Sequence, residues 1–291
     1  MARIIAVGDK SQAIYAFRGA DSKSMNRIET ELKACILPLS VCYRCPKSVI
    51  KLAQNIVPDI EACDHAPEGN VYNIKDTEIN GIAESGDFIL CRCTAPLVSL
   101  CYEFLREGKR AYVKGRDIGQ SLIAFMERLK ADSFEDLTQK LNEYAATVIP
   151  ALIEQNKEQE AILAQDKIDT LFILIEGCKD VDCVKAKIES LFSDTESNGI
   201  CLSTVHKAKG LEAERVFILC PEKMPHPMAK TPEAQEQEKN IKYVAFTRVK
   251  FTESFEGALY ISKTTKEKRS LVRSNAQELI QEKAQEVQFK D

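Results

Sequence analysis

Short apolar runs alternate with segments of helical periodicity along most of this chain. Apolar faces at helical spacing predict helices after Pro46 and over residues 95–107 and 234–249. The runs that favour β-strands lie at residues 4–7, 71–74, 88–91, 111–114, 199–205, 216–220 and 257–262. Because strands that alternate with helices are typical of a parallel sheet covered by helices, we predict an α/β fold.

The run at residues 4–7 has the continuous apolar character of a buried parallel strand and ends at Gly8 and Asp9. A buried strand normally has a neighbour on each side. We therefore expect the rest of its sheet to lie outside this chain.

Residues 116–198 differ in character, because strand patterns are nearly absent there. Apolar residues instead recur at intervals of three and four, as at Ile168, Leu171, Phe172 and Ile175. This spacing predicts an all-helical insertion of about three to five helices. From residue 263 onward the chain is rich in Lys, Glu and Gln, which favours a surface helix or a frayed tail.

The 291 residues carry a net charge of −4, which argues against a polybasic nucleic-acid binder but leaves room for a local basic groove. No apolar run approaches the ~20 residues of a membrane span. The N-terminus lacks the apolar stretch and the cleavage site of a signal peptide. We therefore expect a cytoplasmic protein with no membrane contact.

Eleven cysteines at irregular spacing, without a secretion signal, favour reduced thiols over a disulfide framework. Cys42 and Cys45 have the spacing of one half of a zinc site, but no second pair accompanies them at zinc-finger spacing. We interpret them as small buried residues and expect no metal ligands among them.

Four segments carry side chains suited to nucleotide and nucleic-acid chemistry. The first, residues 7–20, follows the run at 4–7, at the strand end where α/β sheets place ligand groups. Its Gln12 amide can contact a phosphate or a water, and Phe17 beside Arg18 offers a stacking face next to a cation. The alternative for this segment taken alone is an aromatic-rich turn that packs the domain.

The second and third segments add further groups of this kind. In the second, Tyr43 can stack on a base and Arg44 can contact phosphate oxygens with two parallel hydrogen bonds. The third, residues 202–212, supplies hydroxyls and lysines that suit a phosphodiester backbone, and Glu212 can accept from a ribose hydroxyl. His206 within it has the alternative role of an ordinary loop histidine.

The fourth segment, residues 241–250, places Arg248 late in a predicted helix. The alternative role for this arginine is an ordinary positive charge that interacts with the C-terminal end of the helix dipole. Together the segments read Gly-Asp-x-x-Gln-x-Ile-Tyr-x-Phe-Arg-Gly-Ala, Tyr-Arg, Thr-Val-His-x-Ala-Lys-Gly-Leu-Glu and Tyr-Val-Ala-x-Thr-Arg. In this order they resemble motifs III, IV, V and VI of superfamily 1 helicases of the UvrD/Rep/PcrA type. The resemblance covers residues 4 to about 262, with the insertion and the tail matching loosely.

The resemblance implies a RecA-like parallel sheet of the P-loop NTPase type, namely the second helicase domain with an all-helical insertion. We expect the chain to divide accordingly. The parts are a remnant of the first RecA-like domain with motif III (1–34), the second RecA-like domain 2A (35–115 and 199–265), a reduced 2B-like insertion (116–198) and a charged tail (266–291).

The resemblance also implies ATP as the nucleotide and gives catalytic roles to three residues. Gln12 is expected to sense the γ-phosphate and the attacking water. Arg44 and Arg248 are expected to act as arginine fingers on the γ-phosphate, where they stabilise transition-state charge.

For ATP binding, the resemblance implies that Tyr43 stacks on the adenine and that Glu212 holds the ribose. Gly210 is expected to allow a close approach of the backbone. The residues that the resemblance assigns to single-stranded DNA, as stacking, coupling or backbone contacts, are Tyr15, Phe17, Arg18, Ser203, Thr204 and His206.

The chain departs from the family pattern in several places. Lys10 and Ser11 stand where acidic residues are usual, and Cys42 and Cys45 replace the customary Asn and Ser. The sequence contains neither a Gly-x-x-x-x-Gly-Lys-Ser/Thr loop nor the acidic Asp-Glu pair that precedes motif III. We therefore expect Mg²⁺ to be held mainly by a missing N-terminal part.

The resemblance favours the C-terminal part of an ATP-dependent 3′–5′ DNA helicase, with a role in DNA repair. Its expected partners are single-stranded DNA and an N-terminal half or subunit that carries the P-loop, and the chain alone is expected not to hydrolyse ATP. The alternatives are a non-catalytic module that binds DNA or a partner helicase, and a truncated gene product. The joint presence of Gln12, Arg44, Glu212 and Arg248 favours the enzyme.

Overall fold

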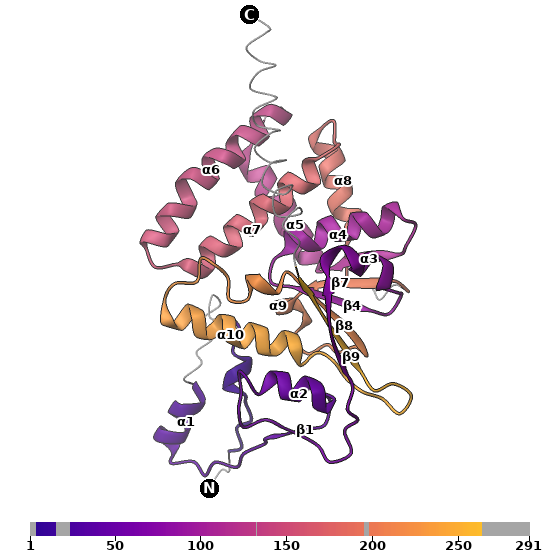
Figure 1. Ribbon diagram of the computed structural model, residues 1–291. Coiled ribbons are helices and arrows are strands. Elements are labelled where there is room, and N and C mark those ends of the chain that lie inside the picture. The colour runs from indigo at the N-terminus through magenta and orange to yellow at the C-terminus, as the bar shows by residue number, and fades with distance from the viewer. Residues whose placement is uncertain (1–3, 16–23, 132, 195–197, 264–291) are drawn as a thin grey trace, which may run out of the picture.

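A seven-stranded sheet forms the centre of the molecule in the computed structural model, which describes residues 4–15, 24–131, 133–194 and 198–263 (Figure 1). The strand order is β3-β9-β8-β4-β7-β5-β6, and neighbouring strands pair in parallel. The strands are β3 Asn70–Lys75, β4 Phe88–Cys91, β5 Ala111–Lys114, β6 Phe192–Ser193, β7 Ile200–Thr204, β8 Arg215–Leu219 and β9 Ala258–Lys263. This architecture confirms the predicted α/β fold.

Strand β4 shows why a continuous apolar run becomes a central strand here. It lies between β7 and β8, and all four of its residues are buried. Ile89 and Cys91 belong to the apolar cluster on one face of the sheet, and Phe88 and Leu90 to the cluster on the other. Successive side chains of a strand point to opposite faces, so a strand covered on both sides needs apolar residues at every position.

Helices cover both faces of the sheet (Figure 1). The first face carries α3 Ile79–Ile82, α4 Thr94–Arg106, α5 Arg116–Leu129, α6 Phe134–Glu154, α7 Glu158–Ile175 and α8 Val181–Leu191. The opposite face carries α2 Lys47–Ala53, α9 Val205–Ala208 and α10 Pro232–Phe246. In the described part of the predicted insertion, α5 to α8 are the only α-helices and β6 is the only strand.

No helix within the described ranges has both the length and the apolar character needed to cross a bilayer. The expected cytoplasmic location stays a prediction.

The N-terminal region differs from the prediction. Residues 4–7 do not form a buried strand: Ile4, Ile5 and Val7 are 74%, 90% and 78% exposed. A strand needs a neighbour to satisfy its backbone groups, and no strand of the described residues lies beside this run. The elements that follow were not predicted: the 3₁₀ turn η1 Lys10–Gln12, the helix α1 Ser24–Leu32 and the small parallel pair β1 Val41–Cys42 and β2 Glu61–Ala62.

A buried ion pair fixes α10 against the end of β4. The Arg92 guanidinium, which directly follows β4, donates from Nε to both carboxylate oxygens of Glu238 at 2.9 and 3.0 Å and from Nη2 at 2.8 Å. The two side chains are only 2% and 0% exposed. Gln159 of α7 accepts from Arg92, and the backbone amide of His226 donates to Glu238. This network positions α10, the helix that ends immediately before Thr247 and Arg248.

Two carboxylates of α7 cap two other helices. Asp166 accepts from the backbone amides of Thr94 and Ala95, at 2.8 and 3.2 Å, at the start of α4. Glu158 accepts from the backbone amide and the hydroxyl of Thr231, which is the N-cap of α10. A carboxylate at a helix N-terminus accepts hydrogen bonds from amides that lack helical partners. Its negative charge also interacts favourably with the positive end of the helix dipole. Helix α7 therefore holds the N-termini of α4 and α10 in place.

We expect His226 to make the protein less stable as the pH falls from 6.5 towards 4. Burial lowers the pKa of His226 to about 4, with further contributions from the charges of Arg92 and Lys223. Its Nδ1 accepts from the backbone amide of Met228, a hydrogen bond that only the unprotonated nitrogen can accept. Between these pH values the unfolded chain binds more protons than the folded one, so stability is complete above pH 6.5 and declines below it.

Urea unfolding at pH 7 and pH 4.5 of the wild type and a His226→Gln variant measures this effect. After allowance for the partial exposure of His226, the free energy of unfolding of the wild type should fall by about 1–2 kcal/mol more than that of the variant between pH 7 and pH 4.5. Burial raises the pKa of Asp87 to about 6, so its protonation stabilises the folded state as the pH falls. This contribution is the same in the wild type and the variant and cancels in the comparison. Equal losses in the two proteins would contradict the assignment to His226.

Candidate functional site

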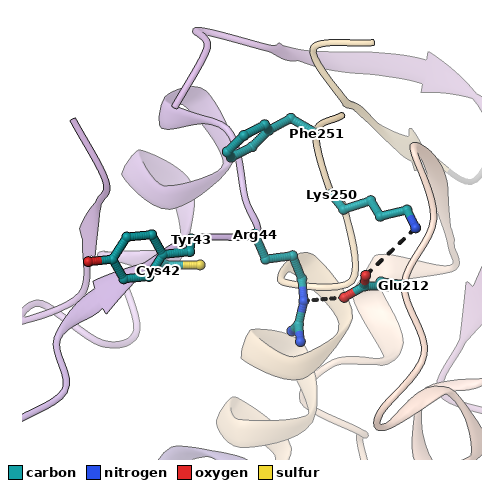
Figure 2. Close-up of a pocket in the computed structure, with 6 residues that line it drawn as sticks. All are labelled: Cys42, Tyr43, Arg44, Glu212, Lys250 and Phe251. Carbon is teal, nitrogen blue, oxygen red and sulfur yellow. Dashed lines mark hydrogen bonds and ion pairs between the residues drawn. The ribbon is translucent and has the colours of Figure 1, made fainter. Parts of the chain in front are cut away.

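A pocket lies where three distant parts of the chain meet (Figure 2). Its lining comes from the β1 turn, from the loop that follows α9 and from the segment that follows α10. The lining residues are Cys42, Tyr43, Arg44, Glu212, Lys250 and Phe251. Tyr43, Arg44 and Glu212 were predicted to bind the nucleotide, and the structure brings them together.

The charged groups of the pocket are joined by ion pairs. Arg44 Nε donates to Glu212 Oε2 at 2.6 Å, and Lys250 Nζ lies 3.7 Å from Glu212 Oε1 (Figure 2). The Arg44 and Glu212 side chains are each 38% exposed. Two cations lie at this edge beside one carboxylate, and their guanidinium and ammonium groups suit an anionic ligand.

An aromatic row borders the same pocket. The Tyr43 ring is 70% exposed, and its centroid lies 6.1 Å from that of His65, which lies 6.2 Å from that of Phe251. An exposed tyrosine face offers a stacking surface for a planar ligand. Sequence reasoning gave no role to His65, Lys250 or Phe251. Lys250 ends the Arg248 segment and Phe251 directly follows it, and this adjacency was the available signal.

Arg248 lies behind the pocket and not in its lining. Its side chain is nearly inaccessible to solvent, with 2% exposure of the residue. Nε donates to the carbonyl oxygen of Val244 at 2.9 Å, and Nη1 donates to that of Leu211 at 3.2 Å. Burial lowers its pKa, and the nearby positive charge of Arg44 lowers it further. Two hydrogen bonds therefore orient the Arg248 guanidinium, which lies near Arg44, the other arginine predicted to act on the γ-phosphate.

The two cysteines around Tyr43 and Arg44 have different environments. Cys45 is buried, as interpreted from the sequence, and its Sγ lies 3.7 Å from the carbonyl oxygen of Thr247. Cys42 is half-buried and lines the pocket. A hydrogen bond from the Cys45 thiol, together with backbone hydrogen bonds, lowers the pKa of Cys42 to about 5 despite its partial burial. At neutral pH the Cys42 thiol is therefore expected to be largely ionised, which adds a negative charge at the pocket wall.

The segment with Gln12 and Tyr15 packs against the same side of the molecule. The Gln12 side-chain amide donates to the Asp9 carboxylate at 2.8 Å, and the backbone carbonyl oxygen of Gln12 accepts from Lys209 Nζ at 2.8 Å. The Tyr15 hydroxyl donates to the carbonyl oxygen of His206 at 2.6 Å. Lys209 also lies 5.5 Å from the Tyr15 ring centroid. These contacts join the first and third predicted segments.

Tyr243 links this group to the pocket. Burial, together with the nearby Asp9, Cys42 and Cys45, raises the pKa of Tyr243 to about 12, and Arg248 opposes them. The Gln12 segment, the pocket wall and the end of α10 are therefore neighbours.

The third segment is partly internal. Ser203 is buried and its hydroxyl donates to the Thr204 carbonyl oxygen at 3.1 Å, and the Thr204 hydroxyl caps α9 by accepting from the amide of Lys207. Gly210 has a φ of +92°, and a Cβ there would meet no atom within 4 Å. A glycine relieves strain at this backbone conformation. As contacts to DNA, Ser203 and Thr204 stay predictions.

Phe17 and Arg18 lie outside the described residues, so their predicted roles are not addressed by the geometry.

Comparison with known protein families gives two matches. The family model described as the UvrD-like helicase C-terminal domain matches residues 118–266, more than half of the 291-residue chain. The model described as the UvrD/REP helicase N-terminal domain matches residues 1–33. No curated protein matches the chain. The parallel sheet agrees with this assignment, and the chain belongs to the UvrD-like helicase family, as a C-terminal portion of such a protein.

Proposed function

We propose that the chain is the C-terminal part of an ATP-dependent 3′–5′ DNA helicase that translocates on single-stranded DNA and unwinds duplex. The observation that carries this proposal is the pocket in which Arg44, Glu212 and Lys250 meet beside Tyr43, with Arg248 behind it. A cationic edge next to an exposed aromatic ring has the groups that a nucleoside triphosphate requires. Membership of the UvrD-like helicase family supports it.

In this proposal each residue has a distinct role. The adenine stacks on Tyr43, the ribose hydroxyls donate to Glu212, and the Gly210 backbone approaches the nucleotide closely. Arg44 and Arg248 stabilise the charge that develops on the γ-phosphate during transfer to water. Gln12, whose amide now contacts Asp9, turns to the γ-phosphate and the attacking water.

Nucleotide binding then competes with the internal ion pair. Arg44 and Glu212 are joined at 2.6 Å, so Arg44 reaches a phosphate and Glu212 a ribose only when that contact opens. The pair is partly exposed, and such pairs contribute about 1 kcal/mol or less. A triphosphate is a stronger partner for the guanidinium, because charged phosphate oxygens accept two parallel hydrogen bonds.

Single-stranded DNA is the proposed second ligand. Tyr15 and His206 are joined by a hydrogen bond and lie next to the Gln12 segment, which offers a direct path between DNA and nucleotide. Phe17 is proposed to stack on a base with Arg18 beside it, and the Thr204 turn to face the backbone. Because Ser203 is fully buried, its proposed part is to shape this turn.

The proposed enzyme uses ATP with Mg²⁺, as its family implies. Across the described residues, no group of three or more His, Cys, Asp or Glu side chains could hold a metal ion. Because the sequence contains neither the P-loop nor the acidic Asp-Glu pair, we assign Mg²⁺ and the P-loop to a separate N-terminal half or partner subunit. Residues 1–34 are proposed to belong with that half, 35–115 and 199–265 to form domain 2A, 116–198 to be the reduced 2B-like insertion and 266–291 the tail.

The exposed apolar side chains of residues 4–7 are consistent with this partner. Ile4, Ile5 and Val7 face solvent in a segment that matches the N-terminal helicase domain. Apolar runs of this kind gain stability when a neighbouring strand covers them.

Reconstitution tests the proposed function. The chain alone, with ATP and single-stranded DNA, is expected to show no hydrolysis. Addition of an N-terminal UvrD/Rep-type half that carries the P-loop is expected to give DNA-stimulated hydrolysis. If sedimentation shows that the two parts associate but no turnover appears, the chain is a non-catalytic binding module. Turnover by the chain alone that depends on Arg248 would show that the P-loop assignment is wrong.

Tyr43→Ala is expected to weaken nucleotide binding by the reconstituted enzyme about tenfold, because loss of a base–aromatic stack costs about 1–3 kcal/mol. Tyr43→Phe keeps the ring and should bind within about twofold of the wild type. Titration with a fluorescent ATP analogue measures both. Equal affinities for the alanine and phenylalanine variants would place the adenine elsewhere.

A further inference from the structure

Two cysteine thiols meet at the turn between α7 and α8, outside the nucleotide pocket. The Sγ atoms of Cys178 and Cys183 lie 2.8 Å apart, about 0.8 Å more than the ~2.05 Å of a disulfide bond. Cys178 follows the end of α7, and Cys183 lies in the first turn of α8. Asp180, the N-cap of α8, accepts from the Cys183 amide at 2.8 Å and fixes this turn. Only a small movement separates the two sulfurs from bonding distance.

This pair differs from the other neighbouring thiols in its access to solvent. Cys178 and Cys183 are both half-buried. Cys45, the neighbour of Cys42, and Cys91, the neighbour of Cys220, are both 0% exposed. An oxidant in solution can therefore reach both thiols at the turn between α7 and α8, whereas in each of the other two pairs one thiol is shielded from it.

A cation lies beside the two thiols. Lys187 Nζ donates to the carbonyl oxygens of Leu174 and Glu176, which places its ammonium at the end of α7. Burial raises the pKa of Cys178, the contact with Cys183 raises it further, and Lys187 opposes both effects. The thiolate is the reactive form of cysteine, so the Lys187 ammonium offsets part of the effect of burial on the reactivity of Cys178.

We propose that Cys178 and Cys183 form an oxidisable dithiol, a modification site that reacts with low-molecular-weight disulfides of the glutathione type. One cysteine thiolate attacks a sulfur of oxidised glutathione, whose S–S bond breaks and releases one glutathione as a thiolate. The second cysteine loses its proton and attacks the mixed disulfide, which releases the other glutathione. The cysteines lose two electrons and two protons, and the oxidised glutathione gains them as two glutathione thiols.

The inference does not depend on the proposed helicase function. The sequence predicts reduced thiols throughout. In this proposal Cys178 and Cys183 are also reduced, but an oxidant can convert them to a disulfide. The cross-link joins the end of α7, the helix whose Glu158 and Asp166 cap α10 and α4, to the start of α8.

Peptide mapping of the full chain tests the proposal. Lys179 lies between the two cysteines, so trypsin separates them into the peptides 168–179 and 180–185. After treatment with oxidised glutathione, alkylation and digestion without reductant, we expect these two peptides to be joined. Because the second step is intramolecular, the joined form should exceed the glutathione adduct about tenfold. Dithiothreitol before alkylation should separate them again.

Cys178→Ser should abolish the joined peptide and leave a glutathione adduct on Cys183, whereas Cys35→Ser, at an exposed and distant cysteine, should leave the cross-link unchanged. The proposal is overturned if the two peptides stay separate and alkylated at a dose that modifies Cys35, or if they carry glutathione without being joined. The map of the wild-type chain decides this even if the Cys178 variant does not fold.

Discussion

Replacement of Arg248 by alanine is expected to lower DNA-stimulated ATP hydrolysis by the reconstituted enzyme about 10³-fold or more, the range seen when an arginine finger is removed. Arg248 is held by the carbonyl oxygens of Val244 and Leu211, so its charge is oriented before the nucleotide arrives. A group fixed in advance next to a phosphoryl group in transfer stabilises the transition state without further reorganisation. Steady-state hydrolysis at saturating ATP and DNA measures the loss.

Two further variants separate catalysis from folding. Arg248→Lys keeps the positive charge but loses the planar fork, and should recover only a small part of the turnover. Arg106→Ala removes an exposed arginine of α4, remote from the pocket, and should hydrolyse ATP like the wild type. Thermal unfolding of each variant shows whether it folds. An Arg248→Ala enzyme that is folded and as active as Arg106→Ala would exclude the finger role.

Glu238→Ala is expected to destabilise the protein by about 3–5 kcal/mol, because it leaves the buried Arg92 charge without its carboxylate. Gln159, which also accepts a hydrogen bond from that guanidinium, supplies one oxygen acceptor in place of two carboxylate oxygens. Urea unfolding followed by circular dichroism measures the change. Loss of the network should also loosen α10, and with it the position of Arg248.

A double variant provides the matched control. Arg92→Met combined with Glu238→Leu removes both charges and keeps apolar volume, and should recover most of the stability lost in Glu238→Ala. Such a recovery would mean that Glu238→Ala loses stability because the Arg92 charge is buried without a partner, and not because the attraction between Arg92 and Glu238 is absent. A double variant as unstable as the single one would argue instead that the pair itself holds α10.

Much of the sheet could be predicted from the sequence because its central strands are buried on both faces. β4 has apolar residues at all positions, β7 lies within its predicted run, and β8 and β9 overlap theirs except for one terminal residue each. β6 has only two residues, too few for any periodicity. The run at residues 4–7 was wrongly predicted because strand formation depends on a neighbour that the local pattern does not contain.

The site was predictable where a motif fixes its members, as for Tyr43, Arg44, Glu212 and Arg248. Its contacts were not, because the ion pair of Arg44 with Glu212 joins residues far apart in sequence. The same holds for Arg92 and Glu238: a charged residue in the sequence carries no sign that it is buried, and only the folded neighbours reveal it.

The parallel pairing of β3 with β9 sets the order in which the chain can complete its sheet. Asn70 pairs with Ala258, and the ladder continues from there to Lys75 and Lys263. During synthesis, β3 leaves the ribosome long before the strand that it needs, and such distant pairings slow folding. A nascent chain that ends before β9 therefore has two unsatisfied strand edges, on β3 and β8, and is expected to depend on chaperones until the last strand arrives.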